Sequence, residues 1–81
     1  MLVRVLYFAG ARDLSSASDE RVEVRDGADL GELTRKVLMA HPRLKSMGRS
    51  VRFSVNLEVA EEGVRLKEGD VVGVLPPVAG G

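Results

Sequence analysis

The residues of this chain whose types and spacing could do chemistry lie at its C-terminus. There an apolar run, Val71 to Leu75, is followed by Pro76-Pro77-Val78-Ala79-Gly80-Gly81. The unusual group in this segment is the α-carboxylate of Gly81, which is inert until it is activated, for example by adenylation. Once activated, it accepts a nucleophile such as sulfide, a thiol or an amine. Because the chain has no cysteine, any sulfur that it carried covalently would have to sit on that carboxyl group.

The residues before Gly81 favour a tail that reaches into a partner. Pro76 and Pro77 restrict φ to about −65° and donate no backbone hydrogen bond, so they end the strand and hold the chain extended. Six extended residues reach at most about 20 Å. Gly80 lacks a Cβ, so the backbone can pass through a channel too narrow for side chains. The alternative is a frayed terminus. A terminal Gly-Gly alone favours fraying, whereas the strand, the double proline and the apolar Val78 favour a functional tail.

The other polar side chains give little sign of catalysis. His41 is the one histidine, and its place just before Pro42 favours a structural role, because an imidazole at a helix end can cap carbonyls. Asp19-Glu20 and Glu61-Glu62 are acidic pairs, but adjacent residues on a strand point to opposite faces, so neither predicts a carboxylate dyad. Glycines that are scattered singly form no phosphate-binding loop. We expect no metal site and no bound cofactor.

The composition indicates one small globular domain. The chain has 81 residues, of which 44% are hydrophobic and 30% are charged, and its formal net charge is zero. A zero net charge gives no sign of a nucleic-acid or anionic-membrane partner. No apolar run approaches the roughly 18 residues of a membrane span. Because small secreted domains usually need disulfides, the lack of cysteine favours a reducing compartment, and we expect a cytoplasmic protein.

Alternating apolar residues predict strands on both sides of a helix. The first strand, residues 2–8, is apolar on both faces, which is typical of a central strand or of one that meets a partner. Residues 20–25 alternate as a half-exposed strand, after a loose connection with one helical turn near residues 9–14. Three further strands are expected at residues 51–55, 57–60 and 71–75.

The helix is the clearest element. Asp29 is a good N-cap, and Glu32 stands three residues later, as in a capping box. Pro42 ends the helix, because the residue before a proline is pushed out of the α region. Gly31 is a weak point in the first turn. The apolar residues that recur at helical spacing on one face are Leu30, Leu33, Val37 and Leu38.

The resulting order, β-β-α-β-(β)-β, predicts an α+β fold. One mixed sheet of four to five strands, with the helix packed across it, is the simplest way to cover the apolar helix face. If the first two strands form a hairpin and the helix crosses over, the last strand returns beside the first in parallel. That is a β-grasp, or ubiquitin-like, arrangement. We assign residues 1–75 to this domain and residues 76–81 to an extended C-terminal tail.

The chain resembles the MoaD family, the small subunits of molybdopterin synthase. The ending GDVVGVLPPVAGG is similar to that family's terminal signature: Gly-Asp before the last strand, then Pro-Pro, an apolar residue, a small residue and Gly-Gly. The opening VRVLYFAGARDL is similar to the family's first strand and the short helix after it. The resemblance runs across the whole chain, is least specific in the middle, and implies the β-grasp fold.

The resemblance implies a sulfur carrier. Gly81 would be adenylated by a MoeB-like activating enzyme that uses ATP, and would then be converted to a thiocarboxylate. The tail would enter the active site of a MoaE-like large subunit and donate sulfur to cyclic pyranopterin monophosphate in molybdenum cofactor biosynthesis. The synthase would be a heterotetramer in which most catalytic side chains belong to the large subunit.

The resemblance carries over to individual residues. Gly81 matches the sulfur-bearing position, and Gly80 matches the slim residue needed for threading. Ala79 stands where the family tolerates several small residues. The stem that positions the tail is matched by Pro76, Pro77 and Val78. We also infer an apolar sheet patch against a partner, with ordinary core as the alternative, and its members would be Phe8, Phe53 and Leu75.

Two other functions also need a terminal Gly-Gly and an activating enzyme. One is a ubiquitin-like protein modifier that is conjugated to lysines through Gly81. The other is a sulfur carrier for a different pathway, such as thiamin synthesis or tRNA thiolation. The Pro-Pro stem favours the subunit of molybdopterin synthase over both.

Overall fold

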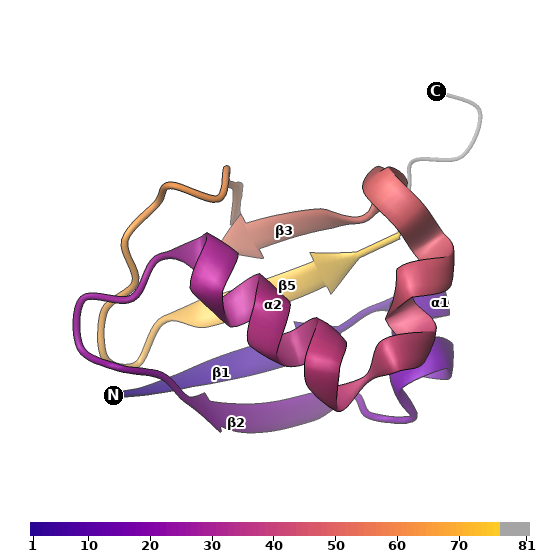
Figure 1. The fold of residues 1–81 in the computed structure, drawn as a ribbon, viewed down its shortest axis with the longest axis horizontal. Coiled ribbons are helices and arrows are strands. Elements are labelled where there is room, and N and C mark those ends of the chain that lie inside the picture. The colour runs from indigo at the N-terminus through magenta and orange to yellow at the C-terminus, as the bar shows by residue number, and fades with distance from the viewer. Residues whose placement is uncertain (77–81) are drawn as a thin grey trace.

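The computed structural model describes residues 1–76, apart from the side chains of residues 49 and 50. These residues form a five-stranded mixed sheet in the order β2-β1-β5-β3-β4. The main helix, α2, lies across one face of the sheet (Figure 1). The expected α+β fold of the β-grasp type is confirmed. In chain order the elements are β1 (Leu2–Tyr7), α1 (Ala9–Ser15), β2 (Asp19–Glu23), α2 (Leu30–Ala40), the 3-10 helix η1 (Pro42–Ser50), β3 (Arg52–Val55), β4 (Glu58–Val59) and β5 (Val71–Leu75).

The first strand lies inside the sheet, as its two apolar faces predicted. β1 pairs antiparallel with β2 and parallel with β5. Val3, Val5 and Tyr7 are buried on the face that α2 covers. Leu2 and Phe8 have the opposite parity, so they lie on the face that α2 leaves open. We call this second face the open face of the sheet.

The start and the end of α2 follow from local sequence. Asp29 is the N-cap, and its carboxylate accepts a hydrogen bond from the backbone N–H of Glu32 at 2.9 Å. The helix ends at its C-cap, His41, directly before Pro42. The apolar stripe of the helix packs on the sheet, and its buried members include Leu30, Leu33 and Val37.

Two helical segments exceed what the sequence pattern predicted. Helix α1 spans Ala9–Ser15, where one turn was expected, and η1 fills the stretch Pro42–Ser50, for which no element was expected. Leu44 of η1 is only 2% exposed and belongs to the core. A single leucine in a polar stretch shows no periodicity, so its burial cannot be predicted from the sequence. It follows from the packing of η1 against α1 and α2.

Hydrogen bonds fix the point where β5 begins. The carboxylate of Asp70 accepts from the side-chain amide of Asn56 at 3.0 Å and from the backbone N–H of Lys67 at 2.8 Å. The side-chain oxygen of Asn56 in turn accepts from the N–H of Val71 at 3.0 Å. Gly69 has a φ of 84° in the preceding turn, a conformation that favours glycine. The Gly-Asp pair before the last strand therefore has a structural reason.

Within residues 1–76, no helix is long and apolar enough to cross a membrane. The cytoplasmic location expected from the sequence stays a prediction. The division into a domain of residues 1–75 and a tail of residues 76–81 also stays a prediction, because residues 77–81 lie outside the described part of the chain.

Candidate functional site

The expected site begins where β5 ends. β5 lies between β1 and β3, and the N–H of Phe8 donates to the carbonyl of Val74 at 3.1 Å. Val72 and Val74 are both 0% exposed, so the strand is anchored in the core almost to its last residue. Pro76 is the last described residue. The roles of the following residues stay predictions, because they lie outside the described part: Pro77, Val78, Ala79, Gly80 and Gly81.

The anchored strand gives the tail a fixed starting point. On one side Val74 is in register with Tyr7 of β1, and on the other side Leu75 is in register with Arg52 of β3. A strand that is paired on both sides cannot swing towards either neighbour without losing ladder hydrogen bonds. A group carried six residues beyond Leu75 is therefore held within about 20 Å of a rigid point.

Phe8 covers a glycine on the open face beside this exit. Its side chain is 44% exposed. A Cβ at Gly73 would come within 3.2 Å of Cε2 of Phe8 and 2.5 Å of Oγ of Ser54, so only glycine permits this close approach. Leu75 follows on the same face of β5 and is half-buried. The structure thus places Phe8 and Leu75 on the same face of the sheet, at the end of β5.

Phe53, the third residue expected in the partner patch, does not join the other two. It is paired with Val74, whose side chain is buried beneath α2, and paired residues share a face of the sheet. Phe53 is partly buried and packs against the core. The single patch of three residues is therefore not formed, and Phe53 belongs to a different surface from Phe8 and Leu75.

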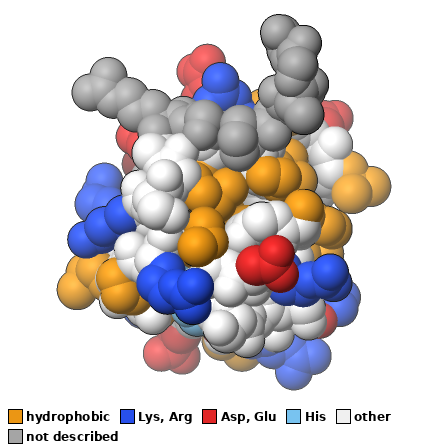
Figure 2. All heavy atoms as spheres, turned by 90° about the vertical axis from the view of Figure 1, so that its right-hand side faces the viewer, with side chains coloured by type: hydrophobic (Ala, Val, Ile, Leu, Met, Phe, Trp, Pro, Cys, Tyr) orange, Lys and Arg blue, Asp and Glu red, His pale blue; other side chains and the backbone are white. Residues whose placement is uncertain are grey.

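Sequence reasoning did not single out Val59, another apolar residue of the open face. It is 72% exposed. Val59 is paired with Ser54, which is paired with Gly73, so the three share this face. The strand register decides which face of the sheet Val59 occupies, and this register cannot be read from the sequence of β4 alone. Figure 2 views the molecule from the end where β5 finishes, and hydrophobic side chains gather there among charged side chains of both signs.

An ion pair lies between β1 and β2 on the open face. The guanidinium of Arg4 contacts the carboxylate of Asp19 at 2.6 Å and donates hydrogen bonds to both of its oxygens. These hydrogen bonds lower the pKa of Asp19 below its ordinary value. Both side chains are exposed, so the pair adds little stability. Its effect is to place a fixed pair of charges between Leu2 and Leu6.

A second polar cluster joins β1, β2 and the end of α2 on the helix side. The hydroxyl of Tyr7 donates to Oε1 of Glu20 at 2.5 Å, and Nε2 of His41 lies 2.8 Å from the same oxygen. The rings of Tyr7 and His41 meet edge to face, with 5.3 Å between their centroids. Burial, followed by the hydrogen bond to Glu20 and its charge, raises the pKa of Tyr7 well above its ordinary value. His41 is the C-cap of α2, where the sequence placed it, but its imidazole binds Glu20 instead of helix carbonyls.

The acidic pair Asp19-Glu20 is split between the two faces of the sheet. Asp19 binds Arg4 and Glu20 binds Tyr7, so the two carboxylates do not form a dyad, as the alternation of a strand predicted. In the described part of the chain, no group of three or more His, Asp or Glu side chains could hold a metal ion. These two polar clusters therefore tie strands and helix together.

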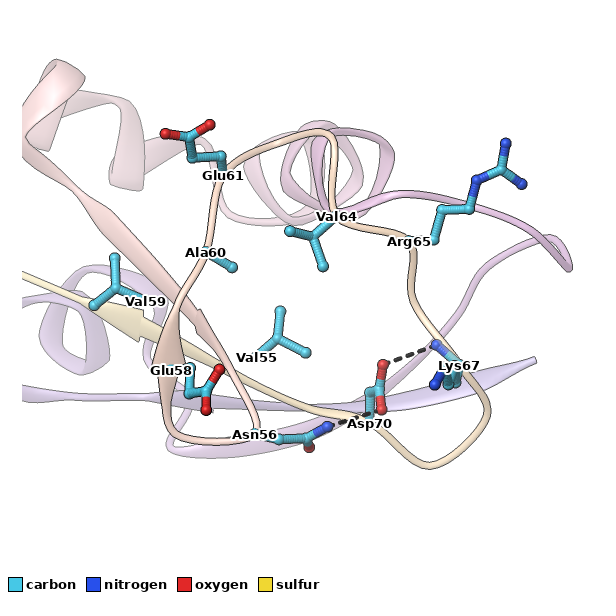
Figure 3. A pocket seen from close by; sticks show the side chains of 10 residues that line it. All are labelled: Val55, Asn56, Glu58, Val59, Ala60, Glu61, Val64, Arg65, Lys67 and Asp70. Atoms are coloured by element: carbon cyan, nitrogen blue, oxygen red, sulfur yellow. Dashed lines mark hydrogen bonds between the residues drawn. The ribbon is translucent and has the colours of Figure 1, made fainter.

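A hollow at the opposite end of β5 was not foreseen. It lies inside the loop that leads from β3 through β4 to β5, and Val55, Ala60 and Val64 point into it (Figure 3). Asn56 and Asp70 at its edge are already hydrogen-bonded to each other. This hollow lies at the start of β5, whereas the predicted tail follows the end of the same strand. The charged residues around it also include Glu58, Glu61, Arg65 and Lys67.

Comparison with known sequences points to one family. A model of the ThiS family matches residues 5–81. A molybdopterin synthase sulfur carrier subunit from Mycobacterium tuberculosis is 38% identical over 98% of this chain and 96% of its own length. A protein of the same name from Chlamydomonas reinhardtii is 35% identical over the full length of both chains.

Comparison with solved structures points the same way. A putative molybdopterin converting factor subunit 1 from Pyrococcus furiosus has a TM-score of 0.86 and 33% identity, and the match covers 95% of this chain and 98% of that one. A chain from the complex of subunits 1 and 2 of the Helicobacter pylori molybdopterin-converting factor has a TM-score of 0.74 and 29% identity over all of both chains. Small archaeal modifier protein 1 from Haloferax volcanii has a TM-score of 0.86 and 25% identity, with coverage of 95% and 98%.

Proposed function

The chain belongs to the ThiS family, and from that premise we propose that it is the sulfur carrier subunit of a molybdopterin synthase. The observation that carries the proposal is the identity of 38% and 35% to two proteins named for that role, over nearly the full length of each. The anchored end of β5 supports it, because a carrier needs a rigid body from which a reactive tail projects.

The reacting group is the carboxylate of Gly81. Its oxygen attacks the α-phosphorus of ATP on a MoeB-like activating enzyme, so that pyrophosphate leaves and an acyl adenylate forms. Sulfide then attacks the carbonyl carbon and AMP leaves, which yields the thiocarboxylate directly. If the donor is a persulfide, the same attack gives an acyl disulfide, and a second thiol reduces it to the thiocarboxylate. On the large subunit this sulfur attacks a carbon of cyclic pyranopterin monophosphate and displaces an oxygen substituent from it. Water then hydrolyses the thioester between the carbonyl carbon and the sulfur, which leaves the sulfur on the precursor and restores the carboxylate. ATP is therefore a substrate of the activating enzyme, and the carrier itself needs no bound cofactor.

The large subunit docks on the open face beside the tail. Phe8 and Leu75 lie there, next to the point where the chain leaves the sheet. The existence of a solved complex between a related subunit 1 and its subunit 2 supports such a partner. The partner is MoaE-like, supplies most catalytic side chains, and forms a heterotetramer with two copies of this chain.

A second candidate is a protein modifier that is joined to lysines through Gly81. The TM-score of 0.86 to a small archaeal modifier protein favours it. The identity to that protein is 25%, below the 35% and 38% found for the molybdopterin synthase subunits. Both functions pass through the same activated carboxylate, so the product that forms on Gly81 distinguishes them.

Intact-mass spectrometry of the chain from its native host, kept cold and without reducing agent, tests the proposal. A sulfur carrier gives a population heavier by the exchange of one oxygen for sulfur, which maps to Gly81. The modifier function would be established instead by a plain carboxylate on the unattached chain together with Gly-Gly remnants on lysines of other proteins.

Changes in the last two residues test the tail directly. Deletion of Gly81, or Gly80→Trp, is expected to abolish sulfur transfer in an assay with purified activating enzyme and large subunit. The melting temperature should stay unchanged, because β5 and the core end before these residues. Ala79→Gly is the matched control and should keep its activity, because it adds no bulk. Normal transfer by the Gly80→Trp variant would contradict the threading of the tail through a narrow passage.

A further inference from the structure

A groove that the proposed function does not use lies on the helix side of the sheet. It runs between α2 and the hairpin of β3 and β4, so its walls come from segments far apart in the chain. It faces away from Phe8 and Leu75, which lie on the open face. We call it the α2–β3 groove, and the lining residues that matter here are Thr34, Leu38, Phe53, Ala60, Glu61 and Glu62.

The floor of the α2–β3 groove is apolar and incompletely covered. Leu38, Phe53 and Ala60 pack against the hydrophobic core, yet each keeps part of its surface exposed. Thr34 adds no unsatisfied polar group, because its hydroxyl donates to the carbonyl of Leu30 at 2.8 Å. An apolar side chain placed in the groove would therefore bury apolar surface on both partners without stranding a polar atom.

The wall opposite α2 is fastened to the start of that helix. The N–H of Gly31 donates to the carbonyl of Glu62 at 2.9 Å, and the N–H of Leu30 donates to the carbonyl of Val64 at 2.8 Å. A Cβ at Gly31 would lie only 3.3 Å from the Cβ of Glu62, so the glycine lets the loop approach the helix. The groove is thus formed before any ligand arrives, which lowers the entropy cost of binding.

The rim of the α2–β3 groove is acidic on the side of the loop after β4. Arg52 also lines the groove, but it is paired with Leu75, so its side chain lies on the open face. Glu61 and Glu62 are exposed, and within residues 1–76 neither carboxylate takes part in an ion pair. Figure 3 shows the side chain of Glu61 directed out of the hollow that Val64 lines, and Glu61 borders the groove as well. Two neighbouring carboxylates without a cation repel each other, so a positive charge brought to this rim is attracted by both.

We infer that the α2–β3 groove docks an extended segment of a partner protein in which an aliphatic side chain is flanked by lysine or arginine. The aliphatic side chain covers Phe53 and Leu38, and the cations meet Glu61 and Glu62. Because the groove and the open face lie on opposite sides of the sheet, this partner binds while the tail and Phe8 are engaged elsewhere. Phe53 is then a docking residue, on a different surface from the one expected.

An NMR titration tests the inference. The probe is the amidated heptapeptide Lys-Arg-Val-Leu-Val-Arg-Lys, added to the full chain labelled with nitrogen-15. Saturable shifts are expected at the amides of Leu38, Phe53 and Glu61, with a dissociation constant below about 1 mM. Leu6 and Gly73, which lie in register on the open face, should not shift. The same peptide with glutamate in place of each basic residue should not bind.

Charge reversal on the rim provides the matched comparison. The double variant Glu61→Lys with Glu62→Lys should weaken binding at least about tenfold, because each reversal replaces an attraction by a repulsion. The control is Asp13→Lys with Glu23→Lys, which changes the net charge equally at exposed positions outside the groove. The control should bind as the natural chain does. All four substitutions are at the surface, and the nitrogen-15 spectrum reports whether each variant is folded.

Four outcomes would overturn the inference. The first is no saturable shift at millimolar peptide, and the second is an equal loss of binding in both double variants, which would leave only an effect of net charge. The third concerns a variant that lacks residues 77–81. If this deletion by itself shifts the groove amides and the peptide then binds more tightly, the chain's own C-terminal segment is the occupant. The fourth is groove shifts that depend on protein concentration, which would make it a second copy. None of these readouts involves sulfur transfer, so the proposed function stands or fails separately.

Discussion

At the scale of single residues, Glu20 makes contacts that no local sequence pattern predicts. One carboxylate oxygen of Glu20 accepts a hydrogen bond from the hydroxyl of Tyr7 and is also hydrogen-bonded to Nε2 of His41. The three residues come from β1, β2 and the end of α2. Each bond spans 13 or more residues of sequence, so the cluster forms only when hairpin and helix are in place.

The Tyr7 hydroxyl makes the folded protein less stable as the pH rises above about 10. Its folded-state pKa is raised above the unfolded value of about 10. The stability that it contributes is therefore complete below about pH 10 and is lost as the pH rises from there towards the folded pKa. In urea unfolding, the natural chain should lose more stability between neutral pH and about pH 11 than Tyr7→Phe does.

The control for this prediction is built into the comparison, because every other titrating group is the same in both proteins. At neutral pH, Tyr7→Phe should cost about 1 kcal/mol, the value of one hydrogen bond. Tyr7 is the one tyrosine in the chain, so tyrosinate absorbance reports it alone and should rise only as the protein unfolds. Ionisation of the folded protein near pH 10 would contradict the buried hydrogen bond.

Two glycines that local rules count as weaknesses have tertiary reasons. Gly31 lies in the first turn of α2, where glycine costs about 1 kcal/mol relative to alanine, but it admits the loop at Glu62. Gly73 lies inside the central strand β5, and it admits Phe8 and Ser54. In both cases the neighbour that requires the glycine is distant in sequence.

At the scale of elements, the turn between β3 and β4 is strained. It is a two-residue turn in which Asn56 and Leu57 both have positive φ, at 50° and 76°. Such turns favour glycine at the second position. Leu57 is 97% exposed, so its side chain gains nothing from burial. The hairpin therefore tolerates a residue that its backbone disfavours.

Leu57→Gly should stabilise the protein. The left-handed backbone destabilises a residue with a Cβ by about 1–2 kcal/mol. Glycine removes this cost, but the greater conformational entropy that it gives the unfolded chain offsets about 0.5–1 kcal/mol of the gain. We expect a gain of about 0–1.5 kcal/mol in the free energy of unfolding measured in urea, by the difference of those two terms. Leu57→Ala is the control and should leave stability unchanged. A loss of stability in both variants would mean that the Leu57 side chain makes a stabilising contact.

The elements themselves were predicted to different degrees. Helix α2 was predicted with its cap and its end, because Asp29, Glu32 and Pro42 act on their immediate neighbours. The strands were predicted from alternation. Helix η1 was not, because Leu44 is the one buried residue among residues 42–48 of this polar stretch and its place is set by packing against the rest of the fold.

At the scale of the whole molecule, the sheet separates two surfaces. The open face carries Phe8 and Leu75 at the end of β5, and the helix side carries the α2–β3 groove with Phe53. Both surfaces belong to one rigid sheet, so a change in one should leave the other intact.

Phe8→Asp tests the open face as the docking surface of the large subunit. Because Phe8 is 44% exposed, the variant should stay folded, while its affinity for the purified large subunit falls at least about tenfold in calorimetry, or roughly 1.4 kcal/mol. Met39→Asp is the control: Met39 is exposed on α2, on the other side of the sheet. Equal affinities for both variants would place the interface elsewhere, and an unfolded Phe8→Asp variant would make Phe8 a core residue.

The sequence by itself determined which segments become strands and the main helix, where α2 starts and stops, the β-grasp order, and the family; the C-terminal tail stays a prediction. These depend on side-chain period, capping and proline geometry, which act over a few residues. Only the tertiary structure decided that Phe53 and Leu75 lie on opposite faces, that Val59 joins the open face, and that Glu20 binds Tyr7. Strand register and helix docking set these contacts, and a shift of one residue in register would turn every side chain of a strand to the other face.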